Sequence, residues 1–237
     1  MTGQGAAVHE ADPPRLILYS DGYNHPFAQS SEALADIARG AGMAVTVTSD
    51  LADALARLRQ GRDVLGINAL RWSMTQFERY AADRPHWAGS LSDGHLAAMA
   101  GHVTSGGGLL AMHTAVICWD NQPGWLELLG GGWNWNRSYH PPLGPITVQP
   151  LPAFTAPFEI VDEAYHHLDP AVDCEIMATA DAGEGAQPVV WRRRRGSGRI
   201  VVDALGHDAR SLGAAGHVAI LEAMLSWLCE KETAHDA

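Results

Sequence analysis

The sequence predicts a single α/β domain on a mostly parallel β-sheet, with extra antiparallel strands in its C-terminal half. Three observations support this prediction. Strand-like apolar segments alternate with helical segments up to residue 113, and such alternation is typical of right-handed crossovers within a parallel sheet. Beyond residue 140 the strand-like segments follow one another with short connections, which favour antiparallel pairing. At 237 residues, the chain is long enough to bury one large core.

The first half of the chain is expected to contain four strands, each an apolar run bounded by turn-forming residues. Gly40 and Gly42 mark the end of the first helix, because glycine readily adopts the backbone conformation that terminates helices. The expected strands are residues 15–20, 44–48, 63–68 and the run that leads to His113, and the expected helices are residues 30–39, 51–59 and 91–105.

The second half is expected to add strands and one closing helix. The expected strands are residues 146–148, 158–161 and 174–177 and a hairpin over 189–205 that turns at a Gly-Ser-Gly sequence, and the helix spans residues 215–231 with an apolar face. Four consecutive arginines, residues 192–195, are expected at the solvated end of the hairpin rather than in an anion site. The predicted domain therefore covers residues 14–232, after a flexible tail at residues 1–13.

Composition excludes several function classes. A formal net charge of −11 disfavours a nucleic-acid binder, because phosphate backbones require a basic surface. No apolar run reaches the roughly 18–20 residues of a membrane span, and residues 1–13 lack the pattern of a secretory signal. We therefore expect a cytoplasmic protein. Its three cysteines, Cys118, Cys174 and Cys229, form no CxxC pair, as expected for reduced thiols.

His113 is the most informative residue of the chain. It follows a glycine-rich turn and a short apolar run, and small residues that begin a helical segment come next. A buried strand that turns sharply into a helix at one functional side chain is the layout of a nucleophile elbow. The Cys or Ser expected in such a turn is replaced here by an imidazole. Ligands bind beyond the carboxyl ends of strands in open α/β sheets, so His113 is expected to face the site.

Other polar residues also follow predicted strands, and they make up the candidate catalytic and metal-binding sets. Imidazoles and carboxylates can ligate a divalent metal, move protons or hydrogen-bond a polyol, and the spacing here does not decide among these roles. The catalytic candidates are His113, His207, Glu163 and Asp208, and the candidate ligands for a divalent metal such as Zn, Mn or Ni are His25, His113, His140 and His207. The histidines expected at the surface or in the C-terminal tail are His95, His102, His217 and His235.

Tryptophans cluster with asparagines between residues 119 and 140. Indole rings can cover the apolar face of a sugar while amides bind its hydroxyls. The alternative is that the rings only cover the core beneath a long loop. The residues of this segment assigned to ligand binding are Trp119, Trp133, Asn134 and Trp135.

These segments together resemble the ThuA-like family of trehalose-utilisation proteins, which is related to class I glutamine amidotransferases. The resemblance covers residues ~15 to 230. It is carried by the run 106–113, by 133–141, by the Asp-Glu-Ala-Tyr at 162–165, by 188–208 with its Gly-His-Asp, and more loosely by Tyr23-Asn24-His25. It implies a flavodoxin-like, amidotransferase-like three-layer sandwich, a role in carbohydrate metabolism and no glutaminase activity. It adds Tyr23, His25 and Tyr165 to the substrate-binding candidates. The segment 68–94 departs from the family pattern and puts the substrate in doubt.

Two hypotheses of different classes follow. The first is an enzyme of sugar or keto-sugar conversion, in which a divalent metal polarises a carbonyl and an unligated His or Glu163 moves a proton; catalysis by the same residues without a metal is a close variant. The second is a non-catalytic carbohydrate-binding or regulatory protein. A thiol enzyme that uses Cys118 is a third possibility. The expected partner is a small carbohydrate, with no nucleic acid or membrane partner, and the fold allows a homo-oligomer.

Overall fold

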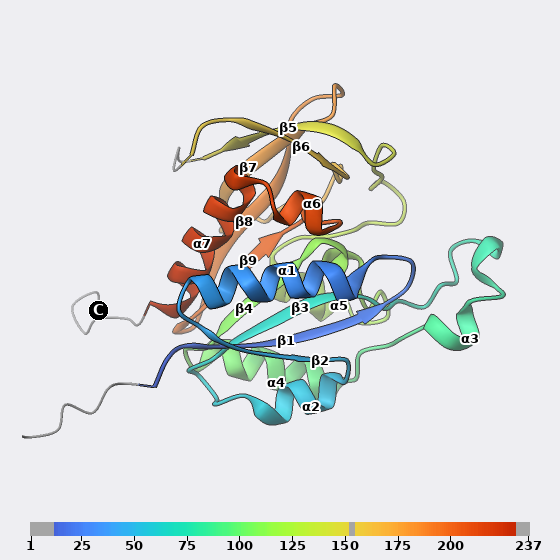
Figure 1. Cartoon of the computed structure of the whole chain (residues 1–237). Helices are drawn as coiled ribbons and strands as arrows, with labels where there is room; N and C mark the ends of the chain where they lie inside the picture. The colour runs from blue at the N-terminus through green and yellow to red at the C-terminus, as the bar shows by residue number, and fades with distance from the viewer. Residues whose placement is uncertain (1–11, 152–154, 231–237) are drawn as a thin grey trace, which may run out of the picture.

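A computed structural model describes residues 12–151 and 155–230, whose strands form one nine-stranded sheet in the order β2-β1-β3-β4-β9-β8-β7-β5-β6 (Figure 1). The strands are β1 (Arg15–Gly22), β2 (Ala44–Thr48), β3 (Val64–Leu70), β4 (Gly108–Met112), β5 (Gly144–Pro150), β6 (Phe158–Asp162), β7 (Glu175–Asp181), β8 (Gln187–Arg195) and β9 (Gly198–Asp203). The helices are α1 (Phe27–Gly40), α2 (Leu51–Arg57), α3 (Arg84–Trp87), α4 (Asp93–Thr104), α5 (Pro123–Leu129), α6 (Ala209–Leu212) and α7 (Ala215–Cys229), with 3₁₀ turns η1 (Glu78–Tyr80) and η2 (His113–Ile117).

The helices form two groups that cover opposite faces of the sheet. Helices α1, α6 and α7 contact one another on one face, and α2, α4 and α5 form a second connected group (Figure 1). Strands β3, β4 and β9, which lie between the two groups, are buried along their whole length. Strand β5 instead alternates exposed and buried residues, because only one of its faces is covered. The core therefore lies on both faces of the sheet, at its central strands.

The α/β fold is confirmed, but the prediction of a mostly parallel sheet is only partly correct. Strands β2, β1, β3, β4 and β9 pair in parallel, whereas every pairing from β9 to β6 is antiparallel. The turn at Gly196, where φ is 58°, joins β8 to β9. A strand joined by so tight a turn must run antiparallel, since a parallel neighbour requires a crossover of a dozen or more residues. The sheet is therefore mixed.

Two surface predictions are wrong. His102 and His217 are fully buried. The Nε2 atom of His102 lies 2.9 Å from the Asp63 carbonyl, and that of His217 lies 3.0 Å from an Asp203 carboxylate oxygen. These partners come from distant segments, so helix position alone could not reveal them. His95 is half-buried on α4, and His235 lies outside the described residues.

The arginine-rich hairpin is present, but only part of its arginine run is solvated. Arg194 and Arg195 are exposed, whereas Arg193 is buried and forms an ion pair with Asp173.

The expected end of the last helix at residue 231 and most of the predicted tail (residues 1–11) lie outside the described residues. Within the described ranges, no helix is both long and apolar enough to cross a membrane.

Candidate functional site

Four polar side chains meet at the carboxyl edge of the sheet. His25, His113 and His207 follow the parallel strands β1, β4 and β9. Glu163 follows β6, which runs in the same direction as β9 because four antiparallel pairings separate the two strands. Residues far apart in the sequence therefore converge where ligands bind in open α/β sheets.

The backbone turns sharply at His113. Its φ is 45°, in the left-handed region that a non-glycine residue rarely adopts, and it connects β4 to the 3₁₀ turn η2. Such strain is tolerated where the surroundings fix the conformation, as in a nucleophile elbow. The ring is 2% exposed, and its Nδ1 lies 2.9 Å from the Ala204 carbonyl. A carbonyl only accepts, so Nδ1 donates and a neutral His113 keeps its lone pair on Nε2.

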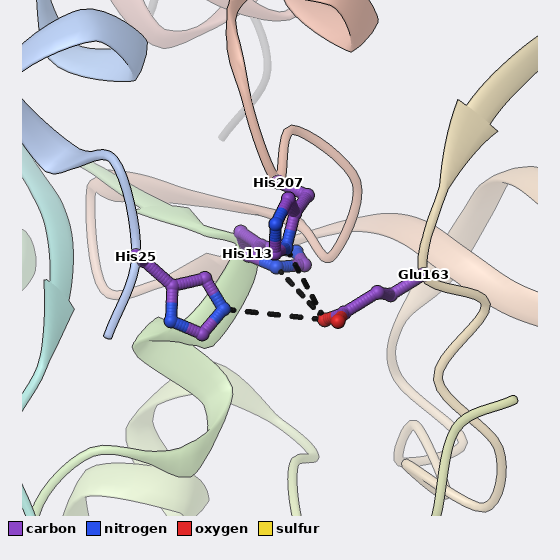
Figure 2. A group of neighbouring side chains, drawn as sticks. All are labelled: His25, His113, Glu163 and His207. Atoms are coloured by element: carbon purple, nitrogen blue, oxygen red, sulfur yellow. Dashed lines mark ion pairs between the residues drawn. The ribbon is translucent and has the colours of Figure 1, made fainter. Parts of the chain in front are cut away.

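The three imidazoles surround the Glu163 carboxylate (Figure 2). The distances to its Oε2 atom are 3.4 Å from His113 Nε2, 3.4 Å from His207 Nδ1 and 4.0 Å from His25 Nε2. His25 Nδ1 lies 3.2 Å from the Tyr23 carbonyl, which fixes the His25 tautomer in the same way as Ala204 fixes that of His113. Both Nε2 lone pairs therefore face the carboxylate when the rings are neutral.

Titration in this cluster is strongly perturbed. Burial by itself would raise the pKa of Glu163, but its close contacts with His113, His207 and His25 outweigh burial and hold the pKa well below the usual range. The contact with the Glu163 carboxylate raises the pKa of His207, against the opposing effect of burial. Burial lowers the pKa of His25. The Glu163 carboxylate is therefore ionised.

The cluster has the composition and geometry to hold a metal ion. One ligand atom from each of His25, His113, Glu163 and His207 lies within 4.8 Å of the others. His25 Nε2 and His207 Nδ1 are buried and have no hydrogen-bond partner, although buried polar atoms are nearly always paired. A divalent cation among the four groups would satisfy both atoms, since imidazole nitrogen and carboxylate oxygen are common ligands of Zn²⁺ and Mn²⁺. The donor set therefore fits a metal.

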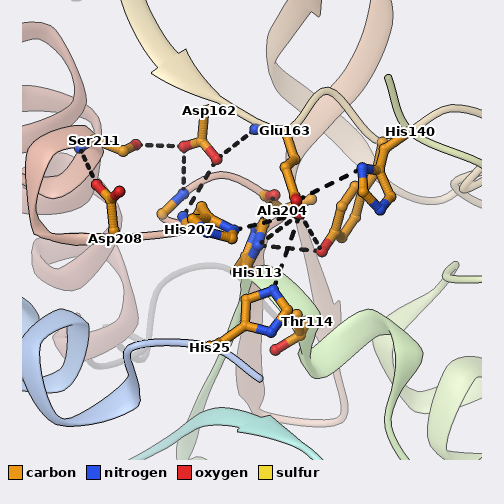
Figure 3. A network of polar contacts seen from close by, with 12 residues as sticks. His25, His113, Thr114, His140, Asp162, Glu163, Ala204, His207, Asp208 and Ser211 are labelled. Carbon is orange, nitrogen blue, oxygen red and sulfur yellow. Dashed lines mark hydrogen bonds and ion pairs between the residues drawn. The ribbon is translucent and has the colours of Figure 1, made fainter. Parts of the chain in front are cut away.

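His140 and Tyr165 also contact the Glu163 carboxylate, and Figure 3 shows the contact with His140. His140 Nδ1 lies 3.7 Å from Glu163 Oε1, the oxygen that does not face the other imidazoles. His140 is therefore outside the group of four ligand atoms, although the sequence placed it among the metal ligands. The buried Tyr165 hydroxyl lies 3.1 Å from His113 Nε2 and 3.3 Å from Glu163 Oε2. Burial raises its pKa well above the usual value, so this hydroxyl stays a donor.

A cavity of about 610 Å³ opens above the cluster. Its floor includes His25, His140, Glu163 and Tyr165. Aromatic rings from three separate segments line its walls. These rings are Tyr23 from the first segment, Trp72, Phe77 and Tyr80 from the second, and Trp133, Trp135 and Tyr139 from the third. Flat apolar walls above a polar floor suit a ligand with both C–H faces and hydroxyl or carbonyl groups, such as a sugar.

Three of the sequence-predicted site residues lie elsewhere. Trp119 is buried, 3% exposed, and packs between Tyr19 and Trp125 in the core. Asn134 is exposed, and its side chain accepts from the Asn136 amide in a turn. Asp208 caps the amino end of α6 and forms an ion pair with Arg210. These three residues have local structural roles.

Two parts of the site are not among the residues that the sequence predicts. Asp162, which was not among the predicted site residues, is fully buried and accepts hydrogen bonds from the Glu163, Gly206 and His207 amides. The aromatic wall formed by Trp72, Phe77 and Tyr80 was also missed. Its signal was the presence of Trp72 in the segment 68–94, which departs from the family pattern.

Comparison with protein families gives one match. The model of a family described as "ThuA: Trehalose utilisation" matches residues 15–228. No curated protein matches the chain.

Several solved structures share the fold. A ThuA-like protein from Parabacteroides merdae ATCC 43184 superposes with a TM-score of 0.69 at 16% identity, over 95% of this chain and 93% of that one. A cytoplasmic protein from Salmonella typhimurium LT2 gives 0.60 at 12% identity, over 92% and 100%. A β-galactosidase from Rahnella sp. R3 gives 0.59 at 13% identity, over 92% of this chain but 31% of that one. At sequence identities this low, the similarity shows a shared fold and no more.

Proposed function

The chain belongs to the ThuA, or trehalose-utilisation, family, and on this premise we propose that it is a metal-dependent enzyme that converts a sugar or keto-sugar. The observation that carries the proposal is the convergence of three imidazoles and one carboxylate, with ligand atoms within 4.8 Å of one another, below an aromatic-walled cavity. The family supports a carbohydrate-related role, and the cavity lining favours the same class of ligand.

In this proposal His25, His113, His207 and Glu163 hold a divalent cation such as Zn²⁺, Mn²⁺ or Ni²⁺. When bound, the cation would polarise a substrate carbonyl or hydroxyl. The carbonyls of Tyr23 and Ala204 keep two of the imidazoles in the tautomer that presents Nε2 to the site. The protein thus fixes the orientation of these two imidazoles before an ion binds.

His140 is the proposed proton carrier. Its Nδ1 lies 2.9 Å from the Pro141 carbonyl, so a neutral ring has its lone pair on Nε2. The ring lines the cavity and is 36% exposed, which lets it exchange protons with water. In the proposed step, the C–H bond next to the substrate carbonyl breaks, its electron pair stays on the substrate and the proton moves to His140. Tyr165 donates a hydrogen bond at the floor of the cavity.

A cytoplasmic location is part of the proposal. It is supported by the cytoplasmic Salmonella typhimurium protein that shares the fold. A thiol enzyme is disfavoured, because Cys118 is buried and burial raises the pKa of its thiol to about 12.

The first test is elemental analysis of protein purified without chelator, beside His113→Ala and His207→Ala and the control His95→Ala. The control removes an imidazole on α4, away from the site. We expect near-stoichiometric metal in the wild type and control, and little in the two site variants. Absence of metal in all four proteins, even after dialysis against Zn²⁺, Mn²⁺ and Ni²⁺, would refute the metal site.

A second test separates the enzyme from a non-catalytic binding protein, the alternative that the missing elbow nucleophile favours. Keto-sugars are incubated with the metal-loaded protein in D₂O, and deuterium incorporation is followed by NMR. Deuterium incorporation at the carbon next to the carbonyl supports the enzyme if wild type shows it and His140→Gln does not. Sugar binding without exchange, equal in wild type and His140→Gln, supports the binding protein.

A further inference from the structure

A buried chain of polar groups lies directly behind the candidate site. It runs from Asp203 at the end of β9 through His217 on α7 and Ser211 on α6 to Asp162 at the end of β6. All four side chains are fully buried. The proposed reaction uses none of them, and such a set of buried polar groups is costly unless every member is paired.

Every link of the chain is a hydrogen bond. His217 Nε2 lies 3.0 Å from Asp203, and its Nδ1 lies 3.1 Å from the Ser211 hydroxyl and 3.2 Å from the Ser211 carbonyl. The hydroxyl in turn donates to Asp162 Oδ2 (Figure 3). Because the carbonyl accepts only, Nδ1 donates. Nε2 donates to the carboxylate, so His217 is an imidazolium paired with Asp203.

Asp162 connects this chain to two of the candidate metal ligands. Its Oδ1 accepts from the Glu163 amide at 2.8 Å and from the His207 amide at 3.3 Å, and its Oδ2 accepts from the Gly206 amide at 2.7 Å. Strands β6 and β9 are separated by three other strands in the sheet, so nothing in their pairing sets the distance between Glu163 and His207. The Asp162 carboxylate joins the two loops directly (Figure 3).

We propose that Asp162, held by Ser211 and the His217–Asp203 pair, is a positioning group that fixes His207 against Glu163 and so sets the metal affinity of the site. The inference rests on the proposed function. A carboxylate that accepts from three amides and one hydroxyl leaves the two loops little freedom. Groups that orient metal ligands in this way typically change metal affinity about 10- to 100-fold when they are removed.

The test compares Asp162→Asn and Ser211→Ala with Asp63→Asn. Asp63 is an equally buried aspartate at the opposite end of the sheet, where it pairs with Arg59, so its substitution controls for the loss of any buried carboxylate. Titration with Co²⁺, followed by its visible absorption, reports both affinity and coordination. We expect a roughly 10- to 100-fold weaker Kd and an altered spectrum in both site variants, and wild-type behaviour in the control.

Amide hydrogen exchange measured without metal keeps this inference separate from the proposed function. Exchange at Gly206 and His207 should be faster in Asp162→Asn than in wild type, and unchanged in Asp63→Asn. If wild type binds no Co²⁺, the proposed function fails while the exchange data still test the positioning group. Unchanged exchange in both folded site variants, or wild-type Co²⁺ affinity and spectrum in them, would overturn the inference. Ser211→Ala keeps the test open if Asp162→Asn does not fold.

Discussion

Glu163 is the residue around which the site is organised, because its carboxylate is the shared partner of His25, His113 and His207. Two of these imidazoles donate their Nδ1 protons to backbone carbonyls. They can interact favourably with the carboxylate only by taking up a proton or by sharing a cation with it. The local hydrogen bonds thus explain why the cluster suits a metal ion.

The tryptophans of residues 119–140 should separate into two functional groups. Trp135→Ala removes a cavity-lining ring that stacks on Trp72, so it should weaken sugar binding about 2- to 12-fold, as expected for the loss of roughly 0.5–1.5 kcal/mol of ring contact. Trp119→Ala empties a core position and should lower the free energy of unfolding by about 3–5 kcal/mol. Calorimetric titration and chemical denaturation measure the two effects. Equal loss of sugar affinity in both folded variants would contradict this division.

Cys118 should be inert in the folded protein. It is buried, its thiol donates to the Ala69 carbonyl, and burial raises its pKa to about 12, so almost no thiolate is present at pH 8. Iodoacetamide at pH 8, followed by peptide mass spectrometry, should modify Cys118 only after unfolding. Rapid alkylation of Cys118 in the native protein, together with loss of activity, would instead support a thiol enzyme.

For single residues, the sequence could predict which polar side chains follow strands, but it could not show which groups they contact. His25, His113, Glu163 and His207 each follow an apolar run that predicts a strand. Nothing in the sequence shows that Glu163, on an edge strand, reaches the centre of the sheet. The role of Asp162 could not be predicted for the same reason, because its Gly206 and His207 partners lie more than 40 residues away.

Helix α7 is fixed to strand β9 by the His217–Asp203 pair. Burial by itself would lower the pKa of His217, but attraction to Asp203 and Asp162 and its hydrogen bonds outweigh burial and raise it. A raised pKa in the folded state stabilises the protein fully below the unfolded value of about 6.5. This contribution is lost as the pH rises through the folded pKa.

His217→Gln should therefore destabilise the protein by about 3–5 kcal/mol at pH 6, because it leaves Asp203 buried without its cation. The difference from wild type should shrink as the pH rises through the folded pKa of His217. Denaturant unfolding of both proteins between pH 5 and 10 measures this. A difference that stays constant with pH would show that His217 is neutral in the folded protein.

The limits of prediction at the element scale follow from strand pairing. The β–α alternation before residue 113 indicated the parallel half, because a helix between two strands brings them side by side in the same direction. The strands after residue 140 were recognised by composition, but their order was not. Strand β6 follows β5 in sequence and occupies the far edge of the sheet, while β7 pairs on the other side of β5.

Over the whole molecule, metal binding should appear as thermal stabilisation. An ion that binds only the folded chain at 100 times its Kd adds about 2.7 kcal/mol, which raises the Tm of a domain of this size by roughly 5–10 °C. Scanning calorimetry with Zn²⁺ and with excess EDTA measures the shift. His113→Ala should show a much smaller shift, and a shift as large as that of wild type would mean that the stabilising ion binds elsewhere.

We propose above all that His25, His113, Glu163 and His207 hold one divalent cation at the carboxyl edge of the sheet. The most direct measurement is anomalous diffraction at the zinc absorption edge from crystals grown with Zn²⁺. We expect one strong peak about 2.0–2.2 Å from ligand atoms of all four residues. A well-ordered cluster with no peak among these side chains, or a peak held by other residues, would contradict it.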